Sequence, residues 1–516
     1  MNVSQIRHAL SVKRADDFAA WYQEVISAAD MAEESGVRGC MVIKPWGYGI
    51  WERIQRLMDD RIKAAGVQNC YFPIFIPLAN FEREAAHVEG FAKEMAVVTH
   101  HRLIADGKGG LIPDPKAKLE EPLVVRPTSE TIIGDAMARW VQSWRDLPLL
   151  TNQWANVVRW EMRTRMFLRT SEFLWQEGHT AHEDREDALK ETHRALEMYR
   201  ACAEEDLALP VVTGEKPENE RFPGAVETWS IEAMMQDGKA LQAGTSHYLG
   251  TNFAHAAGIK YQDREGSEQF CHTTSWGVST RMIGGIIMTH GDDDGLRVPP
   301  RIAPHQVVIL PMLRDKPEDE PLLAYCEEVR TAIAAQSACG EAVRVLLDKR
   351  PGKAASKRWD WVRKGAPIVI EVGSRDMEGS KLAVLRRDQL WNLDNGKPNF
   401  DFADRNGFIA QIGAVLEEIQ QELFQEARAR RDANITRGVT NMDEVAAFYD
   451  GSTQYPGWLE VQWSKPTGAA LEKVVEQLKE VKLTIRNVPI SAEAADGTCI
   501  FTGEPAVERI LIARAY

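Results

Sequence analysis

The sequence predicts an α+β protein with a large domain built on a mainly antiparallel sheet, then a small α/β domain, and last a small α+β C-terminal domain. Strand-like runs in the first 300 residues are separated by loops and helices rather than by regular βα units. A proline-rich connector follows, and beyond it apolar runs of strand length alternate with helical segments. At 516 residues, the chain also exceeds the size at which one hydrophobic core keeps growing.

The first domain begins with helical patterns. Apolar positions recur at helical spacing over residues 18–32, and a second helix over 51–66 closes at Gly66. The run CYFPIFIPL, residues 70–78, is typical of a strand, and its prolines place it at a sheet edge or a dimer seam. The amphipathic helix over residues 184–207 starts at an aspartate, and we expect it to cover the sheet from outside.

Three further runs are expected to be strands of the large sheet, and the connector after them marks the main domain boundary. The runs are LVVRP (residues 123–127), WANVVRWEM (154–162) and IGGIIMTHG (283–291), and the connector is RVPPRIAPH (297–305). We expect a first domain over residues 1–300, a second over 301–405, a linker helix over 406–440 and a C-terminal domain over 441–516.

Charge and cysteine usage narrow the class of protein. The net charge of −14 argues against a protein that coats nucleic acid non-specifically, because that mode neutralises many phosphates at once. The cysteines are scattered without a CxxC pair, which favours reduced thiols. No apolar run approaches the roughly 18 residues of a membrane span, and the N-terminus lacks a signal-peptide core. We therefore expect a cytoplasmic protein with no membrane partner.

One stretch of the second domain is strongly basic despite the acidic balance of the chain. Either a solvated helix face or a contact with a polyanion explains this stretch. Its basic residues are Lys349, Arg350, Lys353, Lys357, Arg358, Arg363 and Lys364, followed by Arg386 and Arg387.

The segment VVRPTSE places two hydroxyls and a carboxylate directly after a strand. Thr128, Ser129 and Glu130 can converge there on a pocket, or they can form a helix N-cap with Glu130 in the first turn. The segment by itself leaves both interpretations open.

The segment of residues 156–182 predicts a hairpin whose two strands flank a basic loop. Arg159 and Glu161 are two apart on the first strand, so a cation and an acceptor face one ligand, such as a phosphate beside a purine. The loop adds Arg163, Arg165 and Arg169, whose planar guanidinium groups suit phosphate oxygens. The alternative is a solvated hairpin tip.

Two later segments add polar groups around glycines. LQAGTSHYLG contains Gln242, Thr245 and His247 around Gly244, which permits a close backbone approach to a ligand, although a simple turn also explains it. Arg281 precedes a glycine-bearing helix or strand and is a candidate contact to a phosphate or to adenine.

Three longer segments, in order, resemble the signature motifs of class II aminoacyl-tRNA synthetases. GIWERIQRLMDDRIKAAGVQNCYFPIFIP resembles motif 1, VVRWE to EGHTAH resembles motif 2, and GVSTRMIGGIIMTHGDDDGLRVPPRIAPHQVVI resembles motif 3. Together with RPTSE and GTSHYLG, they make nearly the whole chain resemble the prolyl-tRNA synthetases, in the archaeal and eukaryote-like form with an extra C-terminal domain. The resemblance implies a class II catalytic domain followed by an anticodon-binding domain.

The resemblance also implies an activity and a set of site residues. A proline–tRNA ligase of this kind converts L-proline and ATP to prolyl-adenylate and pyrophosphate, then transfers proline to the 3′ end of tRNA(Pro). Its catalytic residues match Arg159, Glu161 and Arg281. Its proline pocket matches Thr128, Glu130, Arg159, Trp175, Glu177, His179 and His247. Its ATP contacts match Arg159, Glu161, Arg169, Thr170, Gln242, Thr245, Ser279 and Arg281, with Mg²⁺ carried by the nucleotide.

Metal binding by the protein itself is not expected. His179 and His182, with Cys271 and His272, are an alternative zinc set as in the threonine-specific relative, but the spacing of that relative's ligands is absent. The C-terminal domain of this form usually binds zinc through two cysteine pairs. Here VQWSKPTGAALE contains no cysteine and CIFT retains only one, so we expect no structural zinc. The sequence predicts that apolar packing holds the domain together instead, through Trp458, Trp463 and Ile500.

The resemblance extends to the partners. Glu378, with Arg386 nearby, matches the anticodon contacts and could accept from a guanine edge, although a solvated β-turn is the alternative. Tyr516 matches a family ending that reaches back toward the active site. The segment between His182 and Ser275 is too short for the large editing insertion of bacterial-type relatives. We expect L-proline, ATP and tRNA(Pro) as ligands, a homodimer through motif 1, and no DNA.

Two rival functions are weighed against this one. A synthetase of the same subgroup for threonine, glycine or histidine is disfavoured by the Thr128/Glu130 pair and the WQEGH segment. A non-catalytic synthetase-like protein that binds tRNA is disfavoured because Arg159 and Arg281 are both present.

Overall fold

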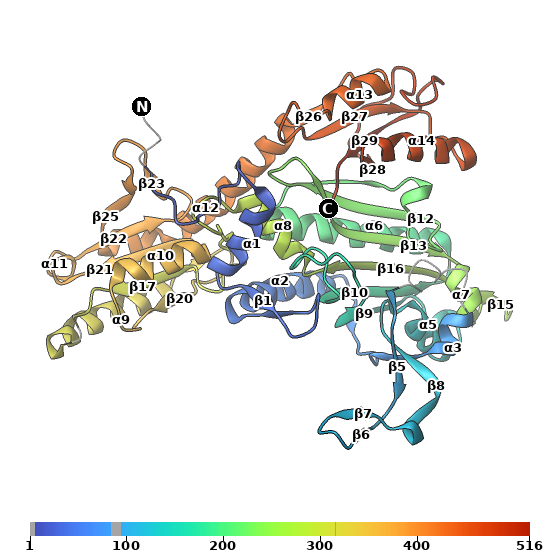
Figure 1. The fold of residues 1–516 in the computed structure, drawn as a ribbon, viewed down its shortest axis with the longest axis horizontal. Coiled ribbons are helices and arrows are strands. Elements are labelled where there is room, and N and C mark those ends of the chain that lie inside the picture. The colour runs from blue at the N-terminus through green and yellow to red at the C-terminus, as the bar shows by residue number, and fades with distance from the viewer. Residues whose placement is uncertain (1–5, 84–93, 315) are drawn as a thin grey trace.

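Three units lie along the molecule in this computed structural model, which describes residues 6–83, 94–314 and 316–516. The first and largest unit carries a broad sheet, the second lies at one end, and the C-terminal unit lies beside the sheet of the first (Figure 1). Within the described residues, no helix is long and apolar enough to cross a membrane.

The broad sheet forms the base of the first unit. Its central strands pair antiparallel, as the sequence predicts. From one edge to the other, it consists of β26 (Ile435–Thr436), β27 (Trp458–Trp463), β29 (Glu508–Ala513), β28 (Thr484–Pro489), β11 (Val211–Glu215), β12 (Glu227–Met234), β13 (Ala240–Gly250), β16 (His272–Ser279), β10 (Glu172–His182), β9 (Leu149–Val158) and β3 (Gln68–Asn69).

Two helices pack on this sheet at its centre. α6 (Arg185–Ala201) contacts β12, β13 and β16, as expected for the covering helix, and a π-helical turn (Cys202–Asp206) extends it. α8 (Arg281–His290) is buried along its whole length behind its first residue. The expected strand over residues 283–291 is therefore wrong. A short run that is apolar on every side cannot be assigned to helix or strand by its periodicity.

Two other strand predictions differ at their ends. The strand expected over residues 154–162 ends at Val158, so Arg159 and Glu161 lie in the following loop and not on one strand face. The strand expected over residues 70–78 shortens to β4 (Phe75–Pro77), because Pro73 and Pro77 limit ladder pairing. The two N-terminal helices form as α1 (Phe18–Ala28) and α2 (Pro45–Ala64).

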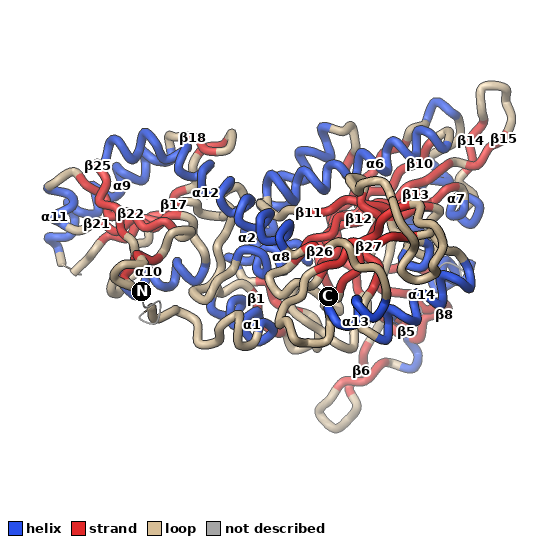
Figure 2. The backbone as a smooth tube through the Cα atoms, turned by 90° about the horizontal axis from the view of Figure 1, so that it is seen from above, coloured by secondary structure: helices blue, strands red, loops and turns tan. Residues whose placement is uncertain are grey.

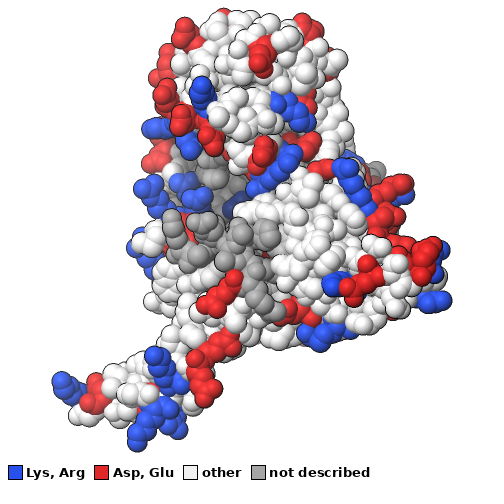
Figure 3. Space-filling view, turned by 90° about the vertical axis from the view of Figure 1, so that its right-hand side faces the viewer, with Lys and Arg blue, Asp and Glu red and all other residues white. Residues whose placement is uncertain are grey.

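A smaller sheet and a projecting hairpin extend from the side of the first unit. β4, β8 (Lys118–Val125) and β5 (Ala96–His100) form the three-stranded sheet, beside α3 (Leu78–Arg83) and α5 (Glu130–Trp140). Between β5 and β8, the strands β6 (Leu103–Ala105) and β7 (Leu111–Pro113) form a hairpin, which we call the arm. The arm stands out from the body and carries lysine and arginine side chains (Figure 3).

The second unit is the α/β domain that the alternating pattern predicts. β20 (Val345–Leu347), β17 (Val307–Pro311) and β21 (Ile368–Val372) pair in parallel, and β22 (Lys381–Arg386) and β25 (Phe400–Asp404) complete the sheet antiparallel. Its helices are α9 (Glu320–Ala334), α10 (Ala354–Lys364) and the short α11 (Ser374–Glu378). The expected connecting helix forms as α12 (Arg405–Ala433), which links this unit to the C-terminal strands (Figure 2).

The C-terminal unit is joined to the first unit by hydrogen bonds between strands. β28 pairs with β11, so one sheet runs through both units. Trp463 lies in the core of the C-terminal unit, together with α13 (Met442–Phe448), α14 (Gly468–Glu480) and a half-buried Ile500. Trp458 instead packs against Met234 and Ala240 of the first unit. Its role therefore differs from the expected one, because it holds the two units together.

A glycine at the centre of the sheet offers a test of this packing. Gly178 of β10 lies over the indole of Trp276, and an added Cβ would come within 2.1 Å of the ring. We expect Gly178→Ala to destabilise the fold by about 1–3 kcal/mol, the usual cost of overpacking, and to lower the thermal unfolding midpoint. Gly36→Ala is the control, because nothing lies within 4 Å of its added Cβ. Equal midpoints for the two variants would contradict this packing.

Candidate active site

A cavity of about 260 Å³ opens on one face of the broad sheet, beside the start of α5 and of α8. Most of the side chains expected to bind proline or ATP surround it. Those that line the cavity are Thr128, Glu130, Arg159, Trp175, Glu177, His179, Gln242, Thr245, His247, Ser279 and Arg281. Glu161, Arg169 and Thr170 are not among the lining residues.

Strand register explains why these side chains meet. Across four neighbouring strands, Gln153 pairs with Glu177, Glu177 with Gly277, and Gly277 with Thr245. Residues opposite each other in a ladder point to the same face, so this row places Glu177 between two polar side chains. Gly277 contributes no side chain to the row, which leaves space over the strand for a ligand.

Glu177 is the most enclosed ionisable group of the cavity, at 3 % exposure. Its Oε1 accepts hydrogen bonds from Ser129 Oγ (2.5 Å) and Gln153 Nε2 (2.6 Å), and its Oε2 lies 2.8 Å from His179 Nε2. Burial raises the pKa of Glu177, but His179, Ser129 and Gln153 more than offset this and lower the pKa below its ordinary value. The pKa of His179 is raised because the pairing with Glu177 outweighs burial. Both shifts favour the ionic form of the pair.

The start of α5 combines the two interpretations of the PTSE segment. Ser129 is the N-cap residue, yet its side chain makes no capping hydrogen bond and instead donates to Glu177. Thr128 donates to Glu130, and both residues face the cavity. A carboxylate and a hydroxyl oxygen are thus available together, which suits a secondary ammonium with two N–H donors.

His247 lies at the same end of the cavity and is uncharged there. Burial, together with the nearby positive His179, lowers the pKa of His247 to about 3. Its Nδ1 lies 3.0 Å from Thr228 Oγ1, and the ring of Phe222 lies 4.9 Å from its own ring. Uncharged and aromatic side chains thus lie beside the acidic ones at this end of the cavity.

Arg159 lies between this end of the cavity and the other. Its Nε donates to the carbonyl of Pro127 at 3.0 Å, and its guanidinium lies 5.7 Å from the centre of the Trp175 ring. The pKa of Arg159 is lowered, because the effect of burial outweighs the opposite effect of the nearby Glu130 and Glu177 carboxylates. The side chain thus reaches the centre of the cavity from the loop after β9.

Arginines dominate the far end. Arg281 begins α8, and its Nε donates to Leu168 O at 3.1 Å. Its pKa is lowered to about 10, first by burial and then by the charges of Arg169 and Arg159. A bound anion would relieve the repulsion between these positive charges. Guanidinium groups bind phosphate oxygens well, through paired hydrogen bonds.

The loop after β9 carries the predicted residues that do not line the cavity. Glu161 accepts from the backbone N–H of Arg163 at 2.8 Å and lies 3.4 Å from Arg169, whose side chain is 55 % exposed. Arg165 lies 5.5 Å from the centre of the Tyr516 ring, and Tyr516 donates to Asp237 at 2.6 Å. The C-terminal residue therefore reaches this loop.

The alternative zinc set does not assemble. His182 Nδ1 lies 2.6 Å from Asp187 Oδ2, His272 Nδ1 lies 2.7 Å from Tyr248 Oη, and His179 pairs with Glu177. In the C-terminal unit, Ser464 and Thr502 share a hydrogen bond of 2.9 Å near the buried Cys499, so the residues there do not fit a tetrahedral zinc. Among the described residues, no three His, Cys, Asp or Glu side chains are grouped to hold a metal.

The candidate anticodon residues differ from each other in their surroundings. Glu378 is exposed at the end of α11, which is a short helix and not the β-turn considered as the alternative. Arg386 forms ion pairs with Asp388 (2.8 Å), Glu418 (2.9 Å) and Glu422 (3.1 Å), so its charge is already balanced within the chain.

The basic stretch before these residues is largely engaged in contacts within the chain. Lys357 is buried and donates to two backbone carbonyls, and Arg350 and Arg358 pair with Asp348 and Glu371. Neither a fully solvated helix face nor a fully free anion site describes this stretch.

Several cavity residues escaped the sequence analysis. Phe222 and its neighbours come from the loop before β12, and Ser275 lies in β16 opposite both His179 and His247. The segment ERFPGA gave only a weak signal, an aromatic residue beside Pro and Gly in a loop. The unassigned lining residues are Phe173, Glu220, Arg221, Phe222, Thr228, Ala243, Gly244, Ser275, Trp276, Gly277 and Val278.

The Glu177–His179 pair predicts a pH-dependent stability. Since the pKa of Glu177 is lowered from 4.5 and that of His179 is raised from 6.5, the pair contributes fully between about pH 4.5 and 6.5. Its contribution is lost as the pH rises through the raised pKa of His179. We expect the difference in unfolding midpoint between the wild type and Glu177→Gln to shrink above that pKa in thermal denaturation scans.

The matched control is Asp348→Asn. This change removes another buried carboxylate, whose pKa is lowered to about 2 and whose partner Arg350 stays charged throughout the range. A midpoint difference for Glu177→Gln that stays constant from pH 5 to 9, as we expect for the control, would contradict the ionic pair.

Comparisons with known proteins agree with the fold. The "tRNA synthetase class II core domain (G, H, P, S and T)" matches residues 115–290, and the "Anticodon binding domain" matches residues 306–393. The chain is 74% identical to a proline–tRNA ligase of Erythrobacter litoralis over 100% of both chains, and 72% identical to one of Novosphingobium aromaticivorans over 100% of both.

A solved structure shares the whole architecture. The prolyl-tRNA synthetase of Cryptosporidium parvum, determined in complex with halofuginone and AMPPNP, superposes with a TM-score of 0.87 at 36% identity, covering 98% of this chain and 97% of that one. Fold, cavity and full-length identity lead to one conclusion, which is that the chain belongs to the prolyl-tRNA synthetase family of class II aminoacyl-tRNA synthetases.

Proposed function

We propose that the cavity carries out both steps of proline–tRNA ligation, with proline at its acidic end and ATP at its arginine end. The chain is a proline–tRNA ligase. A carboxylate oxygen of proline attacks the α-phosphorus of ATP, the bond to the departing pyrophosphate breaks, and prolyl-adenylate remains. A terminal ribose hydroxyl of tRNA(Pro) then attacks the prolyl carbonyl and releases AMP. The separation of charge along one cavity is the observation that supports this assignment.

The acidic end matches the chemistry of proline. Thr128 and Glu130 would accept from the secondary ammonium, and Trp175 and His247 would enclose the ring together with the Glu177–His179 pair. The low pKa of His247 keeps that residue uncharged beside an apolar ring. This arrangement favours proline over an open-chain amino acid.

The arginine end matches a nucleotide. Arg159 lines the cavity and would contact both the proline carboxylate and the α-phosphate, where charge is redistributed in the transition state. Gln242, Thr245, Ser279 and Arg281 line the same end of the cavity. Glu161, Arg169 and Thr170 lie on the loop after β9 and not in the cavity wall, so their contact with ATP requires this loop to close over the bound nucleotide. Mg²⁺ carried by the nucleotide would offset the remaining phosphate charge.

tRNA recognition is proposed for the second unit, whose residues 306–393 match the anticodon-binding domain. Exposed Glu378 is free of the ion pairs that hold Arg386, so it is the better candidate to accept from a guanine edge. Editing in the same chain is not proposed. Residues 183–274 form α6, β11, β12 and β13 of the first unit, with α7 (Asn252–Ala257), β14 (Lys260–Gln262) and β15 (Glu268–Phe270).

A homodimer is proposed on the side of the first unit that carries the arm. Large apolar side chains are exposed there, namely Tyr71 (75 %), Phe75 (48 %), Val97 (49 %), Leu103 (56 %) and Leu111 (69 %). They lie on the segment after β3, on β4 and β5, and on the arm. Tyr71 and Phe75 are part of the segment that resembles motif 1. Several large exposed apolar side chains on neighbouring elements are characteristic of an interface between proteins.

Two variants separate the steps of the proposed reaction. Arg159→Ala should lower proline-dependent ATP–pyrophosphate exchange by about 100-fold or more, since it removes a preorganised charge at the reacting phosphorus. Glu378→Ala should leave exchange unchanged and raise the KM for tRNA(Pro) in aminoacylation by about 10-fold, the cost of one base contact. Arg139→Ala, at an exposed site on α5, is the control.

The same assay can refute the proposal. Faster exchange with threonine than with proline would overturn the substrate assignment. A loss of exchange in Glu378→Ala would contradict the assignment of proline activation to the first unit and tRNA recognition to the second.

The dimer is tested by analytical ultracentrifugation. We expect Tyr71→Glu to weaken association by about 30-fold or more, the effect of an interface hot spot, because it buries a charge. Leu393→Glu is the control, since Leu393 is 77 % exposed on the second unit, far along the chain from motif 1. A wild-type monomer, or equal weakening by both changes, would contradict the proposed seam.

A further inference from the structure

The loop that follows α8 connects this active-site helix to the second unit through side-chain and main-chain contacts. α8 begins at Arg281 and ends at His290, and the segment GDDDG (residues 291–295) follows at once. The helix rises about 15 Å over its length, and its interior residues are buried on all sides. Because a closely packed helix moves as a rigid body, the position of this loop sets the position of Arg281.

A buried ion pair holds the loop to the second unit. Arg387, which follows β22, donates from Nη1 to Asp292 Oδ2 (2.7 Å) and from Nη2 to Asp292 Oδ1 (2.5 Å), while its Nε donates to Val362 O (2.9 Å). The side chain of Arg387 is 2 % exposed. Two parallel hydrogen bonds between a guanidinium and a carboxylate fix both distance and orientation.

Main-chain contacts reinforce this junction. Leu296 N–H donates to Arg363 O (2.9 Å), and Val298 N–H donates to Gly365 O (3.0 Å). At Gly295, where φ is +124°, an added Cβ would come within 2.5 Å of the Arg363 carbonyl oxygen. The loop and the end of α10 therefore touch backbone to backbone, without a flexible layer of side chains between them.

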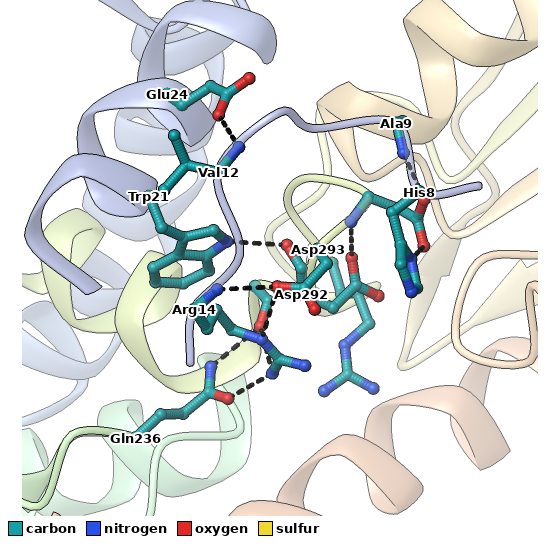
Figure 4. A network of polar contacts seen from close by, with 12 residues as sticks. His8, Ala9, Val12, Arg14, Trp21, Glu24, Gln236, Asp292 and Asp293 are labelled. Carbon is teal, nitrogen blue, oxygen red and sulfur yellow. Dashed lines mark hydrogen bonds and ion pairs between the residues drawn. The ribbon is translucent and has the colours of Figure 1, made fainter. Parts of the chain in front are cut away.

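The N-terminal segment also contacts this loop (Figure 4). His8 and the backbone N–H of Ala9 contact the Asp294 carboxylate, and Arg14 contacts Asp293 and Gln236. The Trp21 indole donates to Asp292 O at 2.9 Å. The three carboxylates of the loop thus have different partners. Asp292 binds Arg387, Asp293 binds Arg14, and Asp294 binds the N-terminal segment and also accepts from Trp391 of the second unit (2.7 Å).

We propose that Arg387 is a positioning residue for adenylate formation, which acts through Asp292 and α8 to hold Arg281 at the phosphate end of the cavity. This inference rests on the proposed role of Arg281 in ATP binding. The acidic end of the cavity is formed by α5, β10 and β13, and among the described residues no hydrogen bond or ion pair joins Thr128, Glu177 or His179 to the GDDDG loop. The effect of Arg387 is therefore confined to the nucleotide, and proline binding does not depend on it.

Steady-state pyrophosphate exchange with the full-length chain tests the inference. We expect Arg387→Met to raise the KM for ATP and lower kcat by about 10-fold each, since a displacement of the order of 1 Å at a charged contact has effects of this size. The KM for proline should change by less than about twofold. Asp292→Asn, which keeps the shape of the side chain, should produce the same split with a smaller loss of stability.

The matched control is Arg358→Met. It removes an arginine of the same unit from a buried pair with Glu371, which does not touch the GDDDG loop. Thermal unfolding of all three variants, together with titration of active sites, corrects for loss of folded protein. The control is expected to lower the unfolding midpoint without changing either KM.

Three outcomes would overturn the inference. An unchanged KM for ATP in both Arg387→Met and Asp292→Asn would show that the pair only stabilises the fold. Equal increases in both KM values would show a general distortion of the cavity. Additive changes in a variant that carries both substitutions would show that the two residues do not act as one unit. If Arg281→Ala itself keeps a normal KM for ATP, the proposed role of Arg281 fails instead.

Discussion

The buried carboxylate of Glu177 is the constraint on which the cavity depends. A charge removed from water is tolerated only when hydrogen bonds and an opposite charge compensate for the lost hydration. Glu177 obtains them from three directions, from Ser129 at the start of α5, from Gln153 on β9 and from His179 on its own strand. Satisfying one carboxylate therefore fixes the position of a helix start and two strands relative to each other.

The same cavity separates its charges, and this separation underlies the proposed chemistry. Acidic and neutral acceptors lie at the end formed by α5 and β10, while Arg159 and Arg281 extend toward the other end. The pKa of Arg281 is lowered first by burial and then by repulsion from Arg169 and Arg159, so its positive charge is unfavourable without a bound anion. A polyphosphate relieves that repulsion, so binding energy is available where the reaction redistributes negative charge.

Parts of the chain far from the cavity are built into its support. β28 extends the catalytic sheet by pairing with β11, and Arg486 of β28 forms a buried ion pair with Glu232 of β12 at 2.8 Å. The second unit forms hydrogen bonds with the loop that follows α8. Segments from all three units thus contribute contacts that support the sheet.

Local patterns were sufficient for the elements whose periodicity is unambiguous. The amphipathic covering helix, the connecting helix and the α/β alternation of the second unit all follow from side-chain spacing. The motif resemblance also named half of the residues that line the cavity, because short segments such as RPTSE and WQEGH carry several site residues at once. The class II fold and the ligase activity were therefore accessible from the sequence.

Tertiary structure decided what depends on contacts between distant segments. The run over residues 283–291 became a helix because burial on every side removes the periodic signal. Arg386 was drawn into ion pairs by carboxylates of α12, and Phe222 and Ser275 joined the cavity through a loop and a strand register that no local pattern encodes. By itself, the sequence determined which chemical groups the protein possesses and which elements carry them. Only the packing of those elements decided which groups meet, since pairing and burial depend on residues far apart in the chain.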